Sequence, residues 1–70
     1  MKQPPIQWND LSARAEGMTI YELQSAIRDI RATLPHADAL DLLDEGNRGG
    51  TYRDEASVYH RELALRGRVA

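Results

Sequence analysis

Residues 19–34 read TIYELQSAIRDIRATL, and the spacing of their aliphatic side chains predicts the principal helix of this protein. Those side chains recur at steps of three, four, three and four: Ile20, Leu23, Ile27, Ile30 and Leu34. Such steps place side chains on one stripe of an α-helix. Thr19 followed by Glu22 forms a capping box, which marks the start of the helix. Pro35 should end it, because proline cannot donate the interior hydrogen bond.

A second amphipathic helix is predicted over residues 51–66. Thr51 and Asp54 have the spacing of an N-cap residue and an acid in its first turn. The apolar positions that follow recur at steps of four, three and four: Tyr52, Ala56, Tyr59 and Leu63. Glu62 and Arg66 are four residues apart, in the order that stabilises a helix.

The segment between these helices is predicted to be a short acidic helix over about residues 37–45. Ala37, Leu40 and Leu43 (or Leu42) should face inward, with the aspartates facing solvent. Gly46 is a natural helix stop. Residues 46–50 read GNRGG and are expected to form a flexible loop.

The N-terminal region is predicted to be an extended arm over residues 1–8, because Pro4-Pro5 fixes the backbone and removes two hydrogen-bond donors. Asn9-Asp10 can then cap a short helical segment, Leu11 to Glu16, that Gly17 stops. Residues 68–70 should form a frayed C-terminus.

The predicted fold class is therefore all-α: a hairpin of two amphipathic helices (19–34 and 51–66) with a connecting helix (37–45), in a single small domain over residues 9–67. A chain of 70 residues without cysteine has no disulfide to supplement a small core. A domain of this size buries only about 60% of the surface that its unfolded chain exposes. We therefore expect the apolar stripe of 19–34 to be covered by a second copy, closing a helical bundle as a homodimer.

The composition indicates a cytoplasmic protein without a membrane segment. The net charge is −2, so the chain as a whole has no strong attraction for nucleic acid. No apolar run approaches the length that spans a bilayer. The first residues, MKQPP, are polar and turn-prone, which argues against a signal peptide.

The polar motifs predict no enzyme, no cofactor and no metal. Asp54, Ser57 and His60 follow one another at steps of three, but a catalytic triad also needs a buried base and an oxyanion hole. Residues 44–55 have the length of a calcium-binding loop, with Arg48 and a glycine at two of the ligand positions. The glycine-rich stretch opens onto the N-terminus of the last helix, whose backbone N–H groups and dipole could attract an anion. No strand precedes this stretch, as one would in a nucleotide-binding fold.

Residues 12–23 read SARAEGMTIYEL, which combines a short helix, a glycine turn and a capped longer helix. This stretch resembles the two-helix portion of ribbon-helix-helix antitoxins and repressors. The resemblance implies a dimeric DNA-binding regulator as the alternative function. The chain departs from that family where DNA would be contacted, because residues 3–8 contain Pro4-Pro5 and no basic side chain.

The function predicted first is that of a small protein–protein interaction module, a regulatory or inhibitory protein of bacterial or phage type that binds and occludes a partner protein. Tyrosine, tryptophan and arginine are over-represented among the residues that dominate protein interfaces. Arg48, Tyr52 and Arg53 surround the glycine loop and form the first predicted contact site. Trp8 and Tyr21 are further predicted partner-binding residues.

Overall fold

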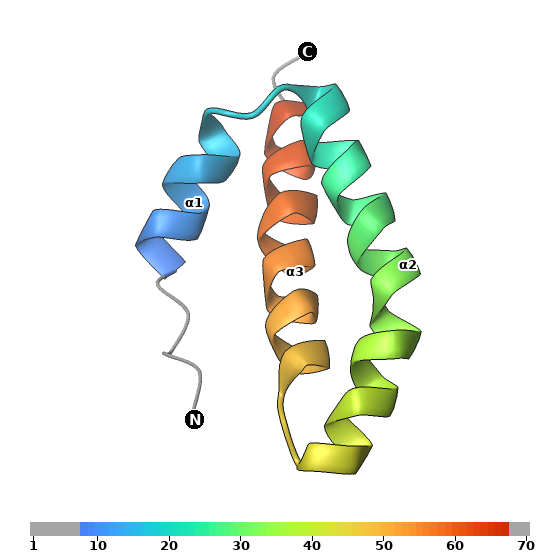
Figure 1. Ribbon diagram of the computed structural model, residues 1–70. Helices are drawn as coiled ribbons and strands as arrows, with labels where there is room; N and C mark the ends of the chain where they lie inside the picture. Colours follow the sequence, from blue (N-terminus) through green and yellow to red (C-terminus); the bar gives the residue numbers. More distant parts are fainter. Residues whose placement is uncertain (1–7, 68–70) are drawn as a thin grey trace.

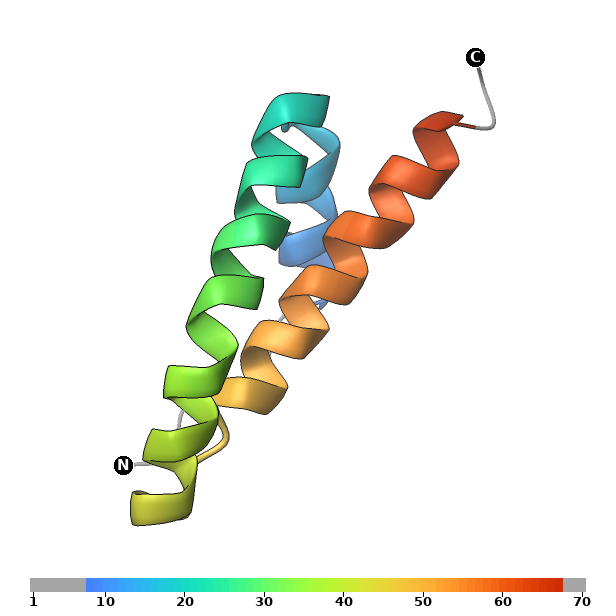
Figure 2. The ribbon, with the colours of Figure 1, turned by 90° about the vertical axis from the view of Figure 1, so that its right-hand side faces the viewer.

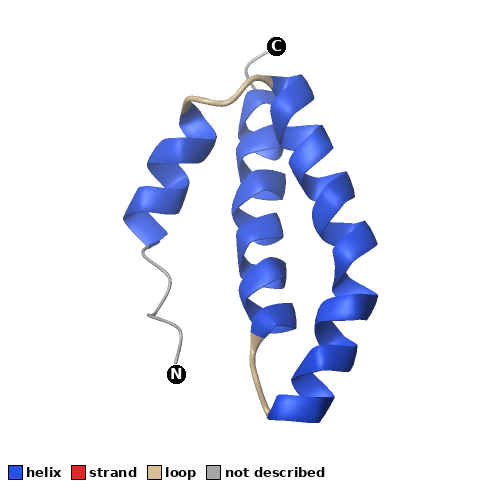
Figure 3. Cartoon of the chain, in the orientation of Figure 1, coloured by secondary structure: helices blue, strands red, loops and turns tan. Residues whose placement is uncertain are grey.

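The computed structural model describes residues 8–67, and this part of the chain has three helices and no strand (Figure 3). Helix α1 spans Trp8–Glu16, α2 spans Ile20–Asp44 and α3 spans Arg48–Gly67. Figure 1 shows that the chain runs up, down and up again, with α2 and α3 joined by a short turn. The expected all-helical class is confirmed. Residues 1–7 and 68–70, with most of the predicted arm and the predicted frayed end, lie outside the described residues.

Helix α2 is continuous where the sequence predicted two helices. Pro35 lies inside it and cannot donate a hydrogen bond to the carbonyl of Arg31. Two residues before Pro35, Thr33 donates its hydroxyl to the carbonyl of Asp29 at 2.8 Å. Both features bend helices, and α2 bows away from α3 (Figure 1). The prediction that Pro35 ends the helix is wrong because the residues beyond it gain contacts with α3 only if the helix continues.

The start of α2 and the end of α1 agree with the sequence. Thr19 accepts a hydrogen bond from the backbone N–H of Glu22 at 3.0 Å, and the Glu22 carboxylate accepts one from the Thr19 N–H at 2.9 Å. The predicted capping box is therefore confirmed. Helix α1 ends before Gly17, as predicted, but it begins at Trp8. Asn9-Asp10 thus lie in its first turn instead of capping it.

Helix α3 begins three residues before the predicted start. The turn is confined to residues 45–47, so most of the predicted glycine loop belongs to α3. Thr51 is not the N-cap; it lies inside the helix and donates its hydroxyl to the Asn47 carbonyl at 3.0 Å. Glu45, not Gly46, adopts the left-handed conformation at the end of α2, with φ of 57°. The physical reason is that two carboxylates of α2 hold this turn: Asp44 accepts a hydrogen bond from the Gly46 N–H at 3.0 Å, and Asp41 accepts one from the Arg48 N–H at 2.9 Å.

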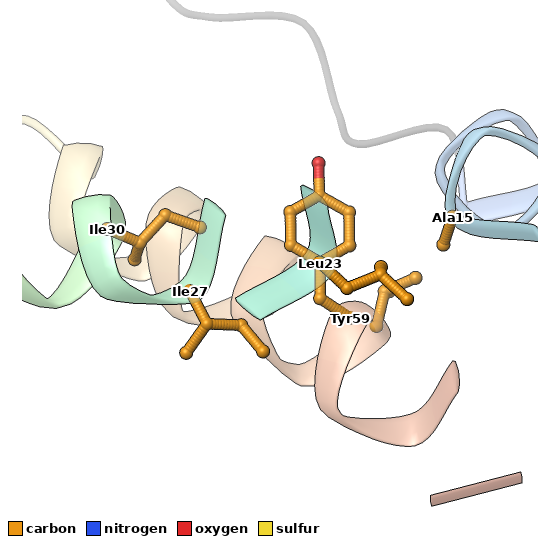
Figure 4. Close-up of a cluster of buried hydrophobic side chains, with 6 residues drawn as sticks. Ala15, Leu23, Ile27, Ile30 and Tyr59 are labelled. Atoms are coloured by element: carbon orange, nitrogen blue, oxygen red, sulfur yellow. The ribbon is translucent and has the colours of Figure 1, made fainter. Parts of the chain in front are cut away.

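The hydrophobic core lies at the end of the molecule where α1 packs. In the side view, α2 and α3 diverge away from their connecting turn (Figure 2). Helix α3 contacts α1 as well as α2. Six buried residues form the core cluster: Ala15, Leu23, Ile27, Ile30, Val58 and Tyr59. Figure 4 shows Leu23 and Tyr59 together, between Ala15 on one side and the two isoleucines on the other.

The predicted stripe is largely buried, as expected, but within one chain. Leu34 and Leu63 are partly buried against the core, whereas Ile20, in the first turn of α2, is 53% exposed. Leu23, Ile27 and Ile30 are covered by other helices of the same chain. The dimer predicted through this stripe stays a prediction, and within one chain three of its five residues are already buried. No helix within residues 8–67 has the length and apolar content needed to cross a bilayer.

Leu23→Ala should remove the most buried large side chain of the core and lower the free energy of unfolding by about 2–5 kcal/mol. Tyr21, two residues away on the same helix, is 74% exposed, so Tyr21→Ala should change the free energy of unfolding by less than about 0.5 kcal/mol. Urea denaturation followed by circular dichroism measures both. Equal losses in the two variants would contradict the placement of the core.

Candidate functional site

Three aspartates in the second half of α2, Asp38, Asp41 and Asp44, face α3, where the sequence predicted that they face solvent. Arg53 binds Asp38 through two parallel contacts of 2.7 and 3.1 Å. Arg48 binds Asp44 in the same way, at 2.7 and 2.9 Å. Two parallel N–H bonds to one carboxylate are the strongest geometry for an arginine ion pair. We call this cluster the ionic corner, and it consists of Asp38, Asp41, Asp44, Arg48 and Arg53.

Asp41, at the centre of the ionic corner, caps α3 from the neighbouring helix. Its carboxylate accepts hydrogen bonds from the backbone N–H groups of Arg48, at 2.9 Å, and Gly49, at 2.8 Å. The first N–H groups of a helix have no partner within it and carry partial positive charge. A carboxylate at this place satisfies two of them at once. Helix α3 therefore begins at Arg48, because Asp41 replaces the N-cap that the sequence assigned to Thr51.

The same contacts lower the pKa values of two carboxyl groups. The pKa of Asp41 lies below its ordinary value chiefly because the Gly49 N–H stabilises the ionised form, helped by the backbone and side chain of Arg48. The pKa of Asp44 is lowered chiefly by the Arg48 side chain. The pKa of Arg48 is raised by the same Asp44 contact. Asp41, Asp44 and Arg48 are thus charged over the whole neutral range.

Two glycines of the predicted loop serve close packing. A β-carbon at Gly49 would overlap the Asp38 carboxylate. A β-carbon at Gly46 would lie 2.8 Å from Asp44 Oδ1 and 3.0 Å from Asp41 Oδ1. Neither glycine has positive φ, so these positions do not exploit the left-handed conformation that glycine favours. The GNRGG stretch is therefore a surface against which the carboxylates of α2 lie.

The first predicted contact site coincides with this corner, but its side chains are already engaged. Arg48 and Arg53 are held by carboxylates of the same chain. Tyr52 is partly buried and packs against the core. Tyr21 is exposed near the opposite end of α2, so the structure does not bring it to the corner. Trp8 is described as the first residue of α1 but its side chain is not, so the predicted contact through Trp8 stays a prediction.

The orientation of the aspartates places apolar residues on the opposite, outer side of α2. Leu42 is 87% exposed and Leu43 is 84% exposed, where the sequence predicted one of them inward. Leu40 is half-buried and Ala37 is buried, as predicted. Exposed apolar residues at helical spacing continue this surface toward the bend. We call it the leucine face, and it consists of Ala32, Pro35, Ala39, Leu42 and Leu43.

Sequence analysis missed the leucine face because it ended the helix at Pro35. A usable signal was present, since Asp38, Asp41 and Asp44 are spaced by three and share one stripe of any helix that contains them. Arg48 and Arg53 follow closely enough to reach that stripe. A turn between the acids and the arginines would bring them face to face and send the leucines outward.

Two further charged contacts join α1 to α3. Tyr59 is buried, and its hydroxyl donates to Glu55 at 2.6 Å and accepts from Arg14 at 2.8 Å. Burial, above all, and Glu55 next raise the pKa of the Tyr59 phenol. Arg66 forms the predicted pair with Glu62 at 3.0 Å. It also donates to the carbonyls of Ala15 and Glu16 at the end of α1, each at 3.1 Å.

An open groove of about 530 Å³ runs between α1 and α3. It is lined by Ser12, Ala15, Glu16, Ser57, Val58, Arg61, Glu62 and Leu65. The Ser57 hydroxyl donates to the Arg53 carbonyl of its own helix at 2.9 Å, which is not the arrangement of a nucleophile bonded to a base. Among the described residues, no three His, Cys, Asp or Glu side chains are grouped to hold a metal ion.

In comparisons with known proteins, no protein-family model, no curated protein and no solved structure matches this chain.

Lowering the pH should weaken the fold through the ionic corner. Because the folded pKa values of Asp41 and Asp44 lie below the ordinary 3.8, their contribution is present above about pH 4 and is lost as the pH falls through the folded values. In Asp41→Asn the free energy of unfolding should start lower at pH 7 and fall less steeply from pH 5 to pH 2. Asp29→Asn, an exposed change of equal charge on α2, should keep the slope of the unmodified protein; equal slopes in all three proteins would contradict this account.

Tyr59→Phe should keep the ring in the core and remove the hydroxyl that joins Arg14 to Glu55. The expected loss in the free energy of unfolding is about 0.5–1.5 kcal/mol, as for one hydrogen-bonded group. Tyr59→Ala should lose about 3–5 kcal/mol, because it also leaves a cavity. Thermal unfolding by circular dichroism separates the two, and a fully stable Tyr59→Ala would refute the placement of this ring in the core.

Proposed function

We propose that this protein is a small non-enzymatic protein–protein interaction module that binds through the leucine face. The observation that carries the proposal is the exposure of Leu42 and Leu43, at 87% and 84%, on the outer side of an ordered helix. Isolated exposed leucines are ordinary on protein surfaces, whereas contiguous apolar patches mark interaction sites. Here the two adjacent leucines share one side of α2 with three further exposed, uncharged residues, Ala32, Pro35 and Ala39.

The energetic incentive for covering this face is substantial. Burial of one leucine side chain contributes about 1.5–3 kcal/mol. Ala39 and Ala32 are small, so a partner can approach the helix backbone closely beside the leucines. The aspartates of this half of α2 are held on the other side by α3, which leaves the leucine face without a formal charge that would have to be desolvated on binding.

The distribution of arginines favours a protein partner over DNA. Four of the seven arginines within residues 8–67 form an ion pair with a carboxylate of the same chain, namely Arg14, Arg48, Arg53 and Arg66, which leaves Arg28, Arg31 and Arg61. A DNA-binding face needs cations that are free to meet phosphates. Occlusion of a partner protein, as a regulatory or inhibitory protein would do, needs only a surface of this kind, and no catalytic group.

Site-specific photocrosslinking in the producing cells tests the proposal. A benzophenone amino acid at Leu43 should yield one discrete crosslinked product, and the same group at Gln24, exposed on the first half of α2, should yield none. Ala39→Asp in the Leu43-labelled protein should abolish the product, because it places a charge in the contact, while the helical circular dichroism stays unchanged. No product at Leu43, or products of equal yield at both positions, would refute the proposed function.

A further inference from the structure

We propose that the partner covering the leucine face is a second copy of this chain, with the two α2 helices antiparallel about a two-fold axis near Asp38. The inference rests on the proposed function, in that it takes the leucine face as a contact surface and names its occupant. It replaces the dimer predicted through the stripe around Ile27, which one chain already buries.

The first argument is the small size of the core in one copy. After Pro35, α2 contributes one buried residue, Ala37, while its two most exposed leucines lie outside. A domain of this length without disulfides is marginally stable alone. A second copy has the same uncovered face, so pairing of two copies buries four leucines. It also gives each chain an apolar contact on the second half of α2.

The second argument is the spacing of the face. Ala32, Pro35, Ala39 and Leu42 follow one another at steps of three, four and three, which is the spacing of a helix–helix seam. Small residues occupy one end of the seam and leucines the other. In an antiparallel pair, the leucines of each copy lie over the small residues of the other, so large side chains meet small ones. A parallel pair would set leucines against leucines and leave the alanines apart.

The third argument is the charge at the two ends of the face. Arg28 and Arg31 are exposed just before it, and Glu45 is exposed just after it. Within residues 8–67, no side-chain hydrogen bond or ion pair engages these three side chains. A two-fold axis near Asp38 brings Arg31 of one copy opposite Glu45 of the other. Antiparallel pairing therefore joins opposite charges at both ends, which sets orientation and register.

The oligomeric state tests the occupant directly. Sedimentation equilibrium of the full chain from 1 to 500 μM should show a monomer–dimer equilibrium. Leu43→Asp should raise the dimer dissociation constant by about ten-fold or more with unchanged circular dichroism, because it buries an unpaired charge. Leu65→Asp, a matched change at a 48% exposed leucine of α3, should leave it unchanged. A wild-type monomer at 500 μM, or equal effects of the two variants, would overturn the inference.

Cysteine variants test the orientation, and the chain has no cysteine of its own to interfere. Ala39→Cys lies near the proposed axis and should form an intermolecular disulfide on oxidation. Leu43→Cys should not, because in this register the two cysteines lie about 15 Å apart along the helices, beyond disulfide reach. Disulfides in both variants would indicate parallel helices and overturn the antiparallel arrangement.

A charge exchange tests the register. Arg31→Glu should raise the dimer dissociation constant by about five-fold, as for exposed ion pairs, and Arg31→Glu with Glu45→Arg should restore it. Failure of the double variant to restore dimerisation would overturn the proposed register.

The photocrosslinked product at Leu43 separates the two proposals. A product of twice the chain mass supports the second copy. A product with a different protein overturns this inference and leaves the proposed function standing, whereas the absence of any product refutes both.

Discussion

The carboxylate of Asp41 at the first turn of α3 is the contact on which the arrangement of the second half of the molecule depends. It satisfies two backbone N–H groups that would otherwise lack partners, and it places a negative charge at the positive end of the helix. Asp38 and Asp44, one turn away on either side, then reach Arg53 and Arg48. A capping interaction that is normally local is made here between two helices, so it fixes their relative rotation as well as the helix start.

That rotation divides the molecule into two ends held together by different forces. At one end, α1, α2 and α3 enclose a small apolar core around Leu23 and Tyr59. At the other end, α2 and α3 meet through the ionic corner, and Ala37 is the one buried apolar residue that α2 adds there within the described part of the chain. Because the polar side of α2 faces inward at this end, its apolar side faces outward. The leucine face is thus a direct consequence of the ionic corner.

Charged side chains also hold the other helix ends. Arg66 donates to the last carbonyls of α1, which matches a cation to the negative end of that helix. The capping box of Thr19 and Glu22 serves the start of α2. A chain this small has few apolar contacts to position its helices, and these polar contacts between helix ends supply much of the geometric definition. They also leave fewer arginines free for an acidic ligand, which is why the proposed function rests on the leucines.

The sequence alone determined the features that depend on neighbours within one helix. The spacing of Leu23, Ile27 and Ile30 predicted a buried stripe, Thr19 with Glu22 predicted the helix start, and Gly17 predicted the end of α1. These are local effects of hydrogen bonding and periodicity. Packing of α2 against α3 settled three further points: whether α2 continues through Pro35, where α3 begins, and which side of the second half of α2 faces solvent. Each of those outcomes depends on carboxylates of α2 that contact arginines and N–H groups of α3. These contacts outweigh the tendency of Pro35 to end a helix, of Thr51 to cap one, and of Leu42 and Leu43 to be buried.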